Sequence, residues 1–153
     1  MTTTIIAYRK AQTEHTTISL ALPDPYLEPD APRCTELCTL DGVTYVAAPD
    51  GVVLPEQPPE IAESVAAVAL TRELREQIKA ASPHCRMIAD QMQGQIRARY
   101  SAEDEMYFAR IGAGAALGLY TFEPGEQEAI AAYGAHVEAV RQWGRAERAK
   151  LGV

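Results

Sequence analysis

Hydrophobic and polar positions follow two different periods along the chain. Near the N-terminus, residues 3–8 and 16–20 are rich in β-branched side chains and predict strands, with residues 10–15 as a polar connection. Beyond residue 70, apolar residues recur at steps of three and four, the period of helices with one buried face. The pattern predicts an α+β fold, with a small antiparallel β head of about four strands followed by a helical half of about three or four helices.

The most specific local signal is Asp41-Gly42, which lies between the β-prone runs 36–40 and 43–47. Asp-Gly predicts a β-hairpin there, because both residues of the tight turn need a positive φ. A second turn is predicted at Pro49-Asp50-Gly51, where turn-forming residues follow the second run.

Proline marks two irregular segments, and eight of the ten prolines precede residue 60. Each proline removes an N–H donor and restricts φ. Residues 23–32 are therefore predicted to form an extended, solvated loop, and residues 55–59 a linker. The expected division is a β-rich, proline-broken head at residues 1–59 and a helical domain at residues 60–153.

Residues 60–70 fit either a helix or a strand. Val65, Val68 and Leu70 suit a strand, whereas the alanines around them favour a helix. The next segment, residues 71–81, is predicted to be helical because Leu74 and Ile78 lie four positions apart, on one face.

Two more helix starts are predicted from capping residues. Ser82 is a suitable N-cap, and Pro83 suits the first helical position, where a missing N–H costs nothing. A buried stripe is expected along that helix, formed by Cys85, Ile88, Met92 and Ile96. Ser101 predicts the following N-cap, with Asp104 as a weaker partner than the Glu or Gln of a full capping box.

The last helix is predicted to run from near Pro124 to Lys150. Gly134 and Gly144 lie inside it, and each costs about 1 kcal/mol relative to Ala. Close approach of another helix, which small residues permit, would offset that cost at both positions.

Composition and charge restrict the classes of function. A chain of 153 residues with 47% hydrophobic residues fits one soluble domain. Residues 1–70 hold ten acids and three Lys/Arg, a charge of −7 (3 − 10), whereas residues 71–153 hold eleven of each. This balance argues against a nucleic-acid partner, since phosphate binding needs a basic face.

Membrane and disulfide classes are not expected either. The longest uncharged apolar run, residues 111–122, is far shorter than the ~20 residues of a membrane span, so no membrane partner is predicted. The first residues lack the basic and apolar regions of a secretory signal. Three cysteines are an odd number, which disfavours a disulfide framework and favours a reducing cytoplasm.

One enzyme hypothesis concerns the N-terminus. Removal of Met1 would expose Thr2, and an N-terminal threonine can act as a nucleophile with its own amine as base. The run Thr-Thr-Thr-Ile-Ile-Ala-Tyr-Arg also resembles the opening of proteasome-type hydrolases. That resemblance implies a lysine further along the chain beside the nucleophile, but the corresponding region offers Arg33 and Cys34. An N-terminal-threonine hydrolase is therefore an alternative function.

Two patterns suggest ligand sites but have plainer interpretations. Cys34, Cys38 and the pair His84-Cys85 lack the second matched pair of a zinc site, so buried thiols are expected. Gly112, Gly114 and Gly118 follow a helix rather than a strand, which is the wrong context for dinucleotide binding. We expect those glycines to end the helix.

The positions of the titratable residues do not indicate an active site. Glu103, Asp104 and Glu105 suit the first turn of a helix, where the helix dipole favours acids, better than they suit an acid–base pair. The three histidines are widely spaced: His15, His84 and His136. We therefore predict no enzyme, with no catalytic, metal-binding or cofactor-binding residue and no cofactor.

Aromatic residues are the remaining candidates for function. Most are expected in the core, but an exposed Tyr, Phe or Trp would mark a protein interface, where such rings are typical anchors. The predicted interface residues are Tyr26, Tyr107, Tyr120, Phe122 and Trp143.

The order of parts resembles small proteins of bacteriophage and prophage tail modules. The residues that carry the resemblance are the hairpin and its exit, CTLDGVTYVAAPDGVVLPEQPPEI, and the helical segments ASPHCRMIADQMQGQIRARYSAEDEMYFARIG and EQEAIAAYGAHVEAVRQWGRAERAKLG. A β-rich, proline-broken head followed by helices and an R-x-W-G-R-like segment is similar to tail-fibre-associated or fibre-assembly proteins.

The resemblance implies a non-enzymatic virion protein of the baseplate and tail-fibre region, or a factor in fibre assembly. Its expected partners are fibre or baseplate subunits of the tail, with homo-oligomers as a further expectation. It would be found in the virion tail, or in the host cytoplasm during assembly. A phage regulatory binding module is a second alternative.

Overall fold

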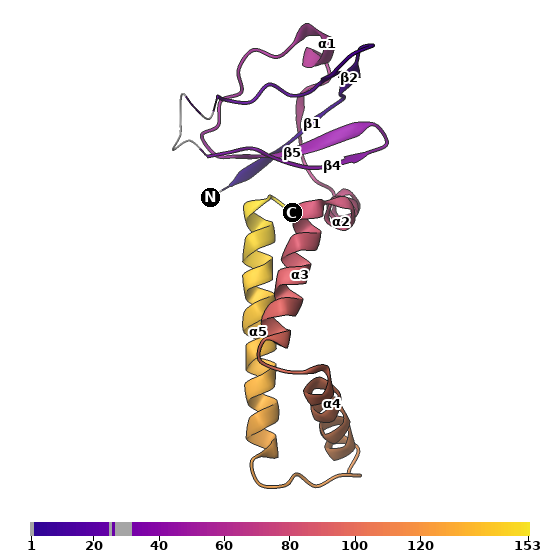
Figure 1. Ribbon diagram of the computed structural model, residues 1–153, viewed down its shortest axis with the longest axis vertical. Coiled ribbons are helices and arrows are strands. Elements are labelled where there is room, and N and C mark those ends of the chain that lie inside the picture. The colour runs from indigo at the N-terminus through magenta and orange to yellow at the C-terminus, as the bar shows by residue number, and fades with distance from the viewer. Residues whose placement is uncertain (1, 25, 27–31) are drawn as a thin grey trace. The chain divides into compact units, whose positions relative to one another are not determined.

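The computed structural model describes residues 2–24, 26 and 32–153 (Figure 1). The strands are β1 (Thr3–Tyr8), β2 (Ala11–Gln12), β3 (Thr17–Ile18), β4 (Thr35–Leu40), β5 (Val43–Pro49) and β6 (Ala66–Val68). The helices are α1 (Pro59–Ala62), α2 (Arg72–Ala81), α3 (Pro83–Arg97), α4 (Ala102–Ala116) and α5 (Glu126–Lys150). An antiparallel sheet followed by a helical half confirms the predicted α+β class.

The chain divides into two compact units. The sheet unit comprises the residues up to Met87 together with Glu147–Val153, and the helical unit comprises Ile88–Ala146. Helices α3 and α5 each have residues in both units. The expected division at residue 59 concerns separable domains and stays a prediction.

The predicted hairpin is confirmed as β4 and β5. Its turn residues Asp41 and Gly42 have φ values of 49° and 77°, the positive φ that the Asp-Gly signal requires. The second predicted turn follows β5, where Gly51 has a φ of 85° and the Val52 N–H donates to the Pro49 carbonyl at 3.2 Å.

The main sheet has the strand order β4-β5-β1-β6, so β1 is a central strand. Side chains of a strand alternate between the two faces of its sheet. On one face, Ile5 packs in a cluster with Leu37, Cys38, Ala47, Ile78, Cys85 and Val153. On the other face, Ile6 and Tyr8 pack with Leu20, Val46, Ala48 and Ile61. The sheet is therefore covered on both faces within its own unit.

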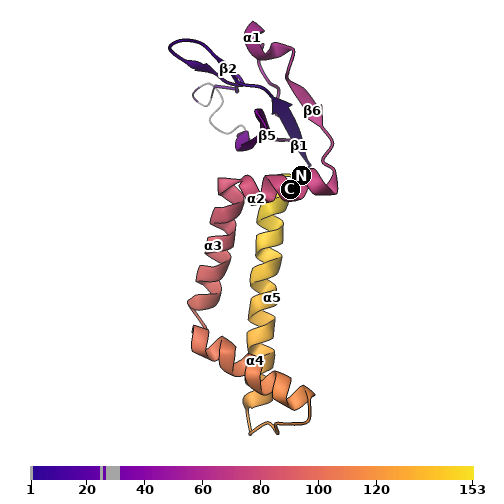
Figure 2. The same ribbon diagram turned by 90° about the vertical axis from the view of Figure 1, so that its right-hand side faces the viewer.

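Residues 60–70 form both of the structures that the sequence allowed. Helix α1 ends at Ala62 and buries Ile61, and β6 begins four residues later, at Ala66. The edge strand β6 pairs antiparallel with β1, with Ala7 opposite Ala66 (Figure 2). The alanine-rich stretch becomes a strand because β1 offers it a free edge.

The predicted strand at residues 16–20 is much shorter than expected. It is reduced to β3, which pairs with β2 in a separate two-stranded sheet. Strand β2 lies in residues 10–15, which were expected to be only a polar connection, so that expectation was wrong. Strands of two residues, such as β2 and β3, are too short to show an alternating hydrophobic and polar pattern in the sequence.

The two proline-rich segments differ in what the structure describes. Most of residues 23–32 lies outside the described residues. In residues 55–59, the Gln57 side chain accepts the Ala21 N–H at 2.9 Å and donates to the Ala21 carbonyl at 3.1 Å. The predicted linker is thus held against residue 21, and it runs directly into α1 at Pro59.

The predicted helix starts are confirmed within two residues. The Thr71 hydroxyl accepts the Leu74 N–H at 3.2 Å at the start of α2, and the buried Ser82 hydroxyl accepts the Cys85 N–H at 3.5 Å at the start of α3.

The predicted stripe on α3 is buried over its first half only. Cys85 and Ile88 are buried, whereas Met92 and Ile96 are half-buried.

Only one of the two glycines inside α5 permits a close helix contact. A Cβ on the buried Gly144 would clash with the Met92 side chain of α3, as the close-approach prediction required. A Cβ on Gly134 would meet no atom within 4 Å, so the prediction was wrong there.

Candidate interaction surface

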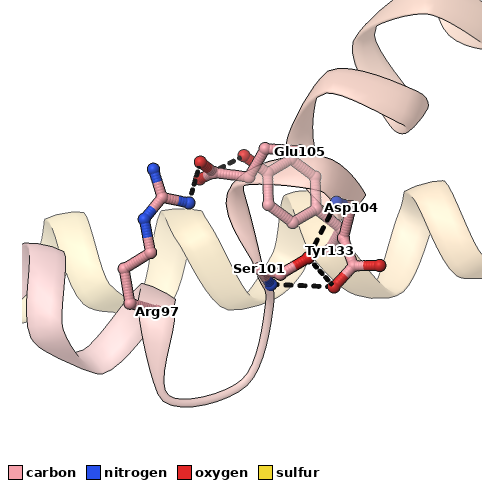
Figure 3. Close-up of polar contacts among 5 residues, drawn as sticks. All are labelled: Arg97, Ser101, Asp104, Glu105 and Tyr133. Carbon is pink, nitrogen blue, oxygen red and sulfur yellow. Dashed lines mark hydrogen bonds and ion pairs between the residues drawn. The ribbon is translucent and has the colours of Figure 1, made fainter.

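The start of α4 is fixed by a reciprocal capping box (Figure 3). The Ser101 hydroxyl accepts the Asp104 N–H at 3.0 Å, while the Asp104 carboxylate accepts the Ser101 N–H at 2.8 Å. The Ser101 hydroxyl also donates to this carboxylate at 2.8 Å, and the bonds from the Ser101 N–H and hydroxyl lower the pKa of Asp104. Asp104 therefore completes the box that the sequence had led us to expect only in a weaker form.

Glu105, in the same turn, joins all three helices of the helical unit (Figure 3). Its carboxylate accepts hydrogen bonds from the Arg97 guanidinium of α3 and from the Tyr133 hydroxyl of α5, the latter at 3.0 Å. Arg97 first, and Tyr133 to a smaller extent, lower the pKa of Glu105. Burial and the bond to Glu105 raise the pKa of Tyr133. Asp104 and Glu105 thus hold structure rather than form a free acid–base pair.

Aromatic rings fill the space between these helices. Tyr100 is the centre of the group, with ring centroids 5.1 Å from Tyr133, 5.7 Å from His136 and 6.1 Å from Phe108. Such edge-on and tilted pairs contribute about 0.5–1.5 kcal/mol each beyond the area they bury. His136 is therefore part of a packed aromatic cluster, and its ring nitrogen lies 3.2 Å from the Gln95 carbonyl.

Two of the predicted interface tyrosines converge on one carboxylate. The Tyr107 and Tyr120 hydroxyls both donate to Glu126, the first residue of α5, with Tyr120 at 2.8 and 2.9 Å from its two oxygens. The Glu123 N–H donates to the same group at 2.8 Å. Tyr107 first, then the Glu123 N–H, lower the pKa of Glu126, and the carboxylate raises the pKa of both tyrosines. This network closes the loop between α4 and α5.

Helix α4 ends in a Schellman motif centred on Gly118, whose φ is 71°. The Leu119 N–H donates to the Gly114 carbonyl at 2.8 Å, and the Gly118 N–H to the Ala115 carbonyl at 3.0 Å. The predicted role as a helix end is confirmed for Gly118. It was wrong for Gly112 and Gly114, which lie inside α4; a Cβ on Gly114 would come within 2.9 Å of the Tyr120 Cβ.

The face of α4 opposite its packed side is exposed and carries apolar as well as charged side chains. Met106 and Leu117 lie eleven positions apart, three helical turns, and are 74% and 73% exposed. Leu119, just past the helix, is 81% exposed. Beside Met106, the side chains of Glu103, Tyr107 and Arg110 line an open hollow of about 310 Å³. The Arg110 guanidinium lies 5.6 Å from the Tyr107 ring centroid. We call Met106, Leu117, Leu119 and this hollow the α4 surface.

The end of α5 has the same local structure as the end of α4, but its apolar residues are covered. Leu151-Gly152-Val153 repeats the pattern of Leu117-Gly118-Leu119, with a φ of 75° at Gly152 and the Val153 N–H bonded to the Arg148 carbonyl at 3.2 Å. Val153 is only 7% exposed because it packs in the cluster that contains Ile5.

Three of the five predicted interface residues lie together. Tyr107, Tyr120 and Phe122 lie together near the α4–α5 loop, where the Tyr120 and Phe122 rings are 6.2 Å apart. Tyr107 is 38% exposed, and the other two are half-buried. Tyr26 is 93% exposed in the sheet unit, and Trp143 is half-buried on α5. The sequence argument missed Met106, Leu117 and Leu119, although Met106 and Leu117 lie opposite Ile111 on a helical projection.

The cysteines that were considered as zinc ligands lie in or against the apolar clusters of the sheet unit. Cys38 and Cys85 are buried in the same apolar cluster, and burial raises the pKa of the Cys34 and Cys38 thiols, which disfavours the thiolate form. Among the described residues, no three His, Cys, Asp or Glu side chains are grouped so that they could hold a metal ion.

Thr2, the residue of the hydrolase hypothesis, faces an acid. Its hydroxyl and N–H both donate to the Asp50 carboxylate, at 2.6 and 2.9 Å. These bonds lower the pKa of Asp50, which makes it a weaker base.

Comparison with models of known protein families, with curated proteins and with solved structures gives no match. Across residues 2–24, 26 and 32–153, we find no helix with the length and apolar character needed to cross a bilayer.

Proposed function

We propose that this chain is a non-enzymatic bacteriophage or prophage tail protein that acts through protein–protein contacts. It would be a structural component of the baseplate and tail-fibre region or a fibre-assembly factor. The observation that carries the proposal is the α4 surface, where Met106 on the helix and Leu117 and Leu119 at its C-terminal end are each more than 70% exposed. Grouped exposed apolar side chains mark interaction sites.

The biological setting of the proposal comes from the resemblance to tail-module proteins. The partners would be fibre or baseplate subunits, and the chain would be found in the virion tail or, during assembly, in the host cytoplasm. The side-chain bonds that hold α4 to α3 and α5 support such a role, because a preordered surface loses less entropy on binding. Glu105 and Glu126 provide that attachment through their bonds to α3 and α5 and to the α4 tyrosine.

Co-purification and mass spectrometry of virions test the proposal. A tagged chain expressed during phage production should isolate fibre or baseplate subunits, and a structural component should also be present in purified particles. An assembly factor would bind those subunits and be absent from particles. Isolation of the chain without any tail subunit would contradict the proposal.

The alternative function is an N-terminal-threonine hydrolase, whose nucleophile would be the Thr2 hydroxyl, 2.6 Å from the Asp50 carboxylate. The mass of the intact protein decides this alternative, because a retained Met1 leaves Thr2 without a free amine. A regulatory binding module would share the α4 surface but would bind a host protein in place of tail subunits.

A further inference from the structure

The most exposed apolar residues of the helical unit are concentrated in α4 and the three residues that follow it. Within Ile88–Ala146, all of which the structure describes, the large hydrophobic residues with high exposure are Met106, Tyr107, Leu117 and Leu119. Met106 and Leu117 share one face with the exposed Arg110 and Ala113 between them. These residues therefore form a strip along one face of α4 and its end, with apolar side chains at both ends and Arg110 between them.

The end of α5 indicates what a tripeptide of this kind contacts when it is covered. In Leu151-Gly152-Val153, the residue after the glycine is buried against apolar side chains of the sheet unit. Leu119 occupies the equivalent position after Gly118 and has no such cover. Leu117-Gly118-Leu119 therefore has the same backbone geometry as Leu151-Gly152-Val153, but it lacks the apolar side chains that cover Val153.

The charge around this strip is acidic. Residues 101–130 hold six acids and one arginine, a charge of −5 (1 − 6). Asp104, Glu105 and Glu126 bond to groups of their own unit. The exposed acids Glu103, Glu123 and Glu128 remain, against Arg110 on the strip itself. Glu103 lines the hollow beside Met106, and Glu123 follows Leu119 in the same loop. A partner with basic side chains around an apolar centre would match both features.

We propose that the α4 surface docks a basic amphipathic helix of a partner protein, with apolar side chains on Met106, Leu117 and Leu119 and flanking Lys or Arg facing the surrounding acids. A second copy of this chain fits less well. A two-fold contact would place the acidic segment against itself, with like charges opposed. The inference rests on the proposed function only in that both require a protein partner.

Peptide binding measured by fluorescence anisotropy tests the docking surface on the full chain. The probe is a labelled helical peptide of about 18 residues with leucines on one face and lysines on the others. One control peptide keeps the leucines and carries glutamate in place of lysine. The other has the composition of the probe in an order that breaks the apolar face. The probe should bind at least about tenfold more tightly than either control.

Variants locate the binding. The double variant L117S/L119S should raise the Kd about tenfold or more, and E103Q/E123Q should raise it about threefold while reducing its salt dependence. The control variant is Val53→Ser, since Val53 is 82% exposed in the sheet unit and should leave binding unchanged. All the altered side chains are exposed, so far-UV circular dichroism should show the fold retained.

Three results would overturn the inference. These are equal binding of the acidic peptide, unchanged binding by L117S/L119S, and self-association in sedimentation that L117S/L119S abolishes, which would make a second copy the occupant. The proposed function is judged separately. A chain that co-purifies with tail subunits but ignores the basic peptide retains the tail role and loses only this partner chemistry.

Discussion

Leu37 and Ile78 in the sheet unit have no exposed surface, whereas Tyr100 and Tyr133, in the aromatic cluster of the helical unit, are only half-buried. The sheet unit is stabilised mainly by apolar burial on both faces of β1. The helical unit depends more on ring contacts and on carboxylates such as Glu105 that bind side chains from other helices. Burial stabilises a unit by itself, whereas the second arrangement leaves apolar area for a partner.

The Schellman motifs at the ends of α4 and α5, around Gly118 and Gly152, show the same contrast. Both follow a helix, both place glycine at positive φ, and both have an apolar residue next. Val153 is covered and Leu119 is exposed. A local motif therefore specifies how the chain turns, but its surroundings decide whether the turn contributes to a core or to a surface.

The largest expected effect is in the sheet core. Leu37→Ala should lower the free energy of unfolding by about 2–5 kcal/mol, because it removes a fully buried side chain and leaves a cavity. Ile96→Ala in the helical unit should cost clearly less, since Ile96 is half-buried. Urea unfolding followed by circular dichroism measures both. Val53→Ala, at an exposed position, is the control and should change stability by less than about 0.5 kcal/mol. Equal costs for Leu37 and Ile96 would break the comparison between the units.

Substitution of the two Schellman glycines, Gly118 and Gly152, should have the next largest effect on stability. Gly118→Ala should cost about 1 kcal/mol, because alanine is strained at positive φ. Gly152→Ala should cost about 1 kcal/mol more, since its Cβ would also lie 3.0 Å from the Ile5 Cδ1 and 3.2 Å from the Thr3 Cγ2. Thermal unfolding of the two variants under one set of conditions measures the difference. If both variants lose the same stability, the close contacts around Gly152 add nothing to the cost of its substitution.

The two glycines of α5 should respond with opposite signs. Gly134→Ala meets open space and should stabilise the protein by about 0.5–1 kcal/mol through helix propensity. Gly144→Ala should destabilise it by about 1–2 kcal/mol, because the added methyl group displaces Met92. Combining Gly144→Ala with Met92→Ala in a double-mutant cycle should show a coupling energy. Stabilisation by Gly144→Ala would mean that the two helices can separate easily.

The smallest expected effect is the dependence of the helical unit on pH. Glu105 and Glu126 have lowered pKa values, so each contributes stability that is present above the ordinary value of 4.5 and is lost as the pH falls through the lowered value. Tyr107, Tyr120 and Tyr133 have raised pKa values, so their contribution is present below 10.0 and is lost at higher pH.

Near-ultraviolet circular dichroism of the aromatic residues measures this dependence. The signal should weaken in acid below about pH 4.5 and in alkali above about pH 10. The variant Glu105→Gln/Glu126→Gln should have a smaller acid response, and Glu103→Gln, whose carboxyl makes none of these bonds, is the control. An unchanged acid response in the double variant would assign it to other groups.

Much of the backbone could be predicted because its causes are local. Asp41-Gly42 predicts a hairpin through the φ values of two residues, and Ser82 and Ser101 predict helix starts through contacts within one turn. The α4 surface could not be predicted in the same way. Aromatic residues were taken as interface candidates by type, yet Tyr120 and Phe122 are half-buried in the α4–α5 loop while Met106 and Leu119 are more exposed.

By itself, the sequence determined the α+β order, the hairpin and the ends of the helices, because these depend on residues within a few positions of one another. Only the tertiary structure decided that residues 66–68 join β1 as a strand, that Gly144 rather than Gly134 permits a close helix contact, and that Val153 is covered while Leu119 is not. Each of these outcomes depends on atoms from distant parts of the chain, so no local pattern contains it.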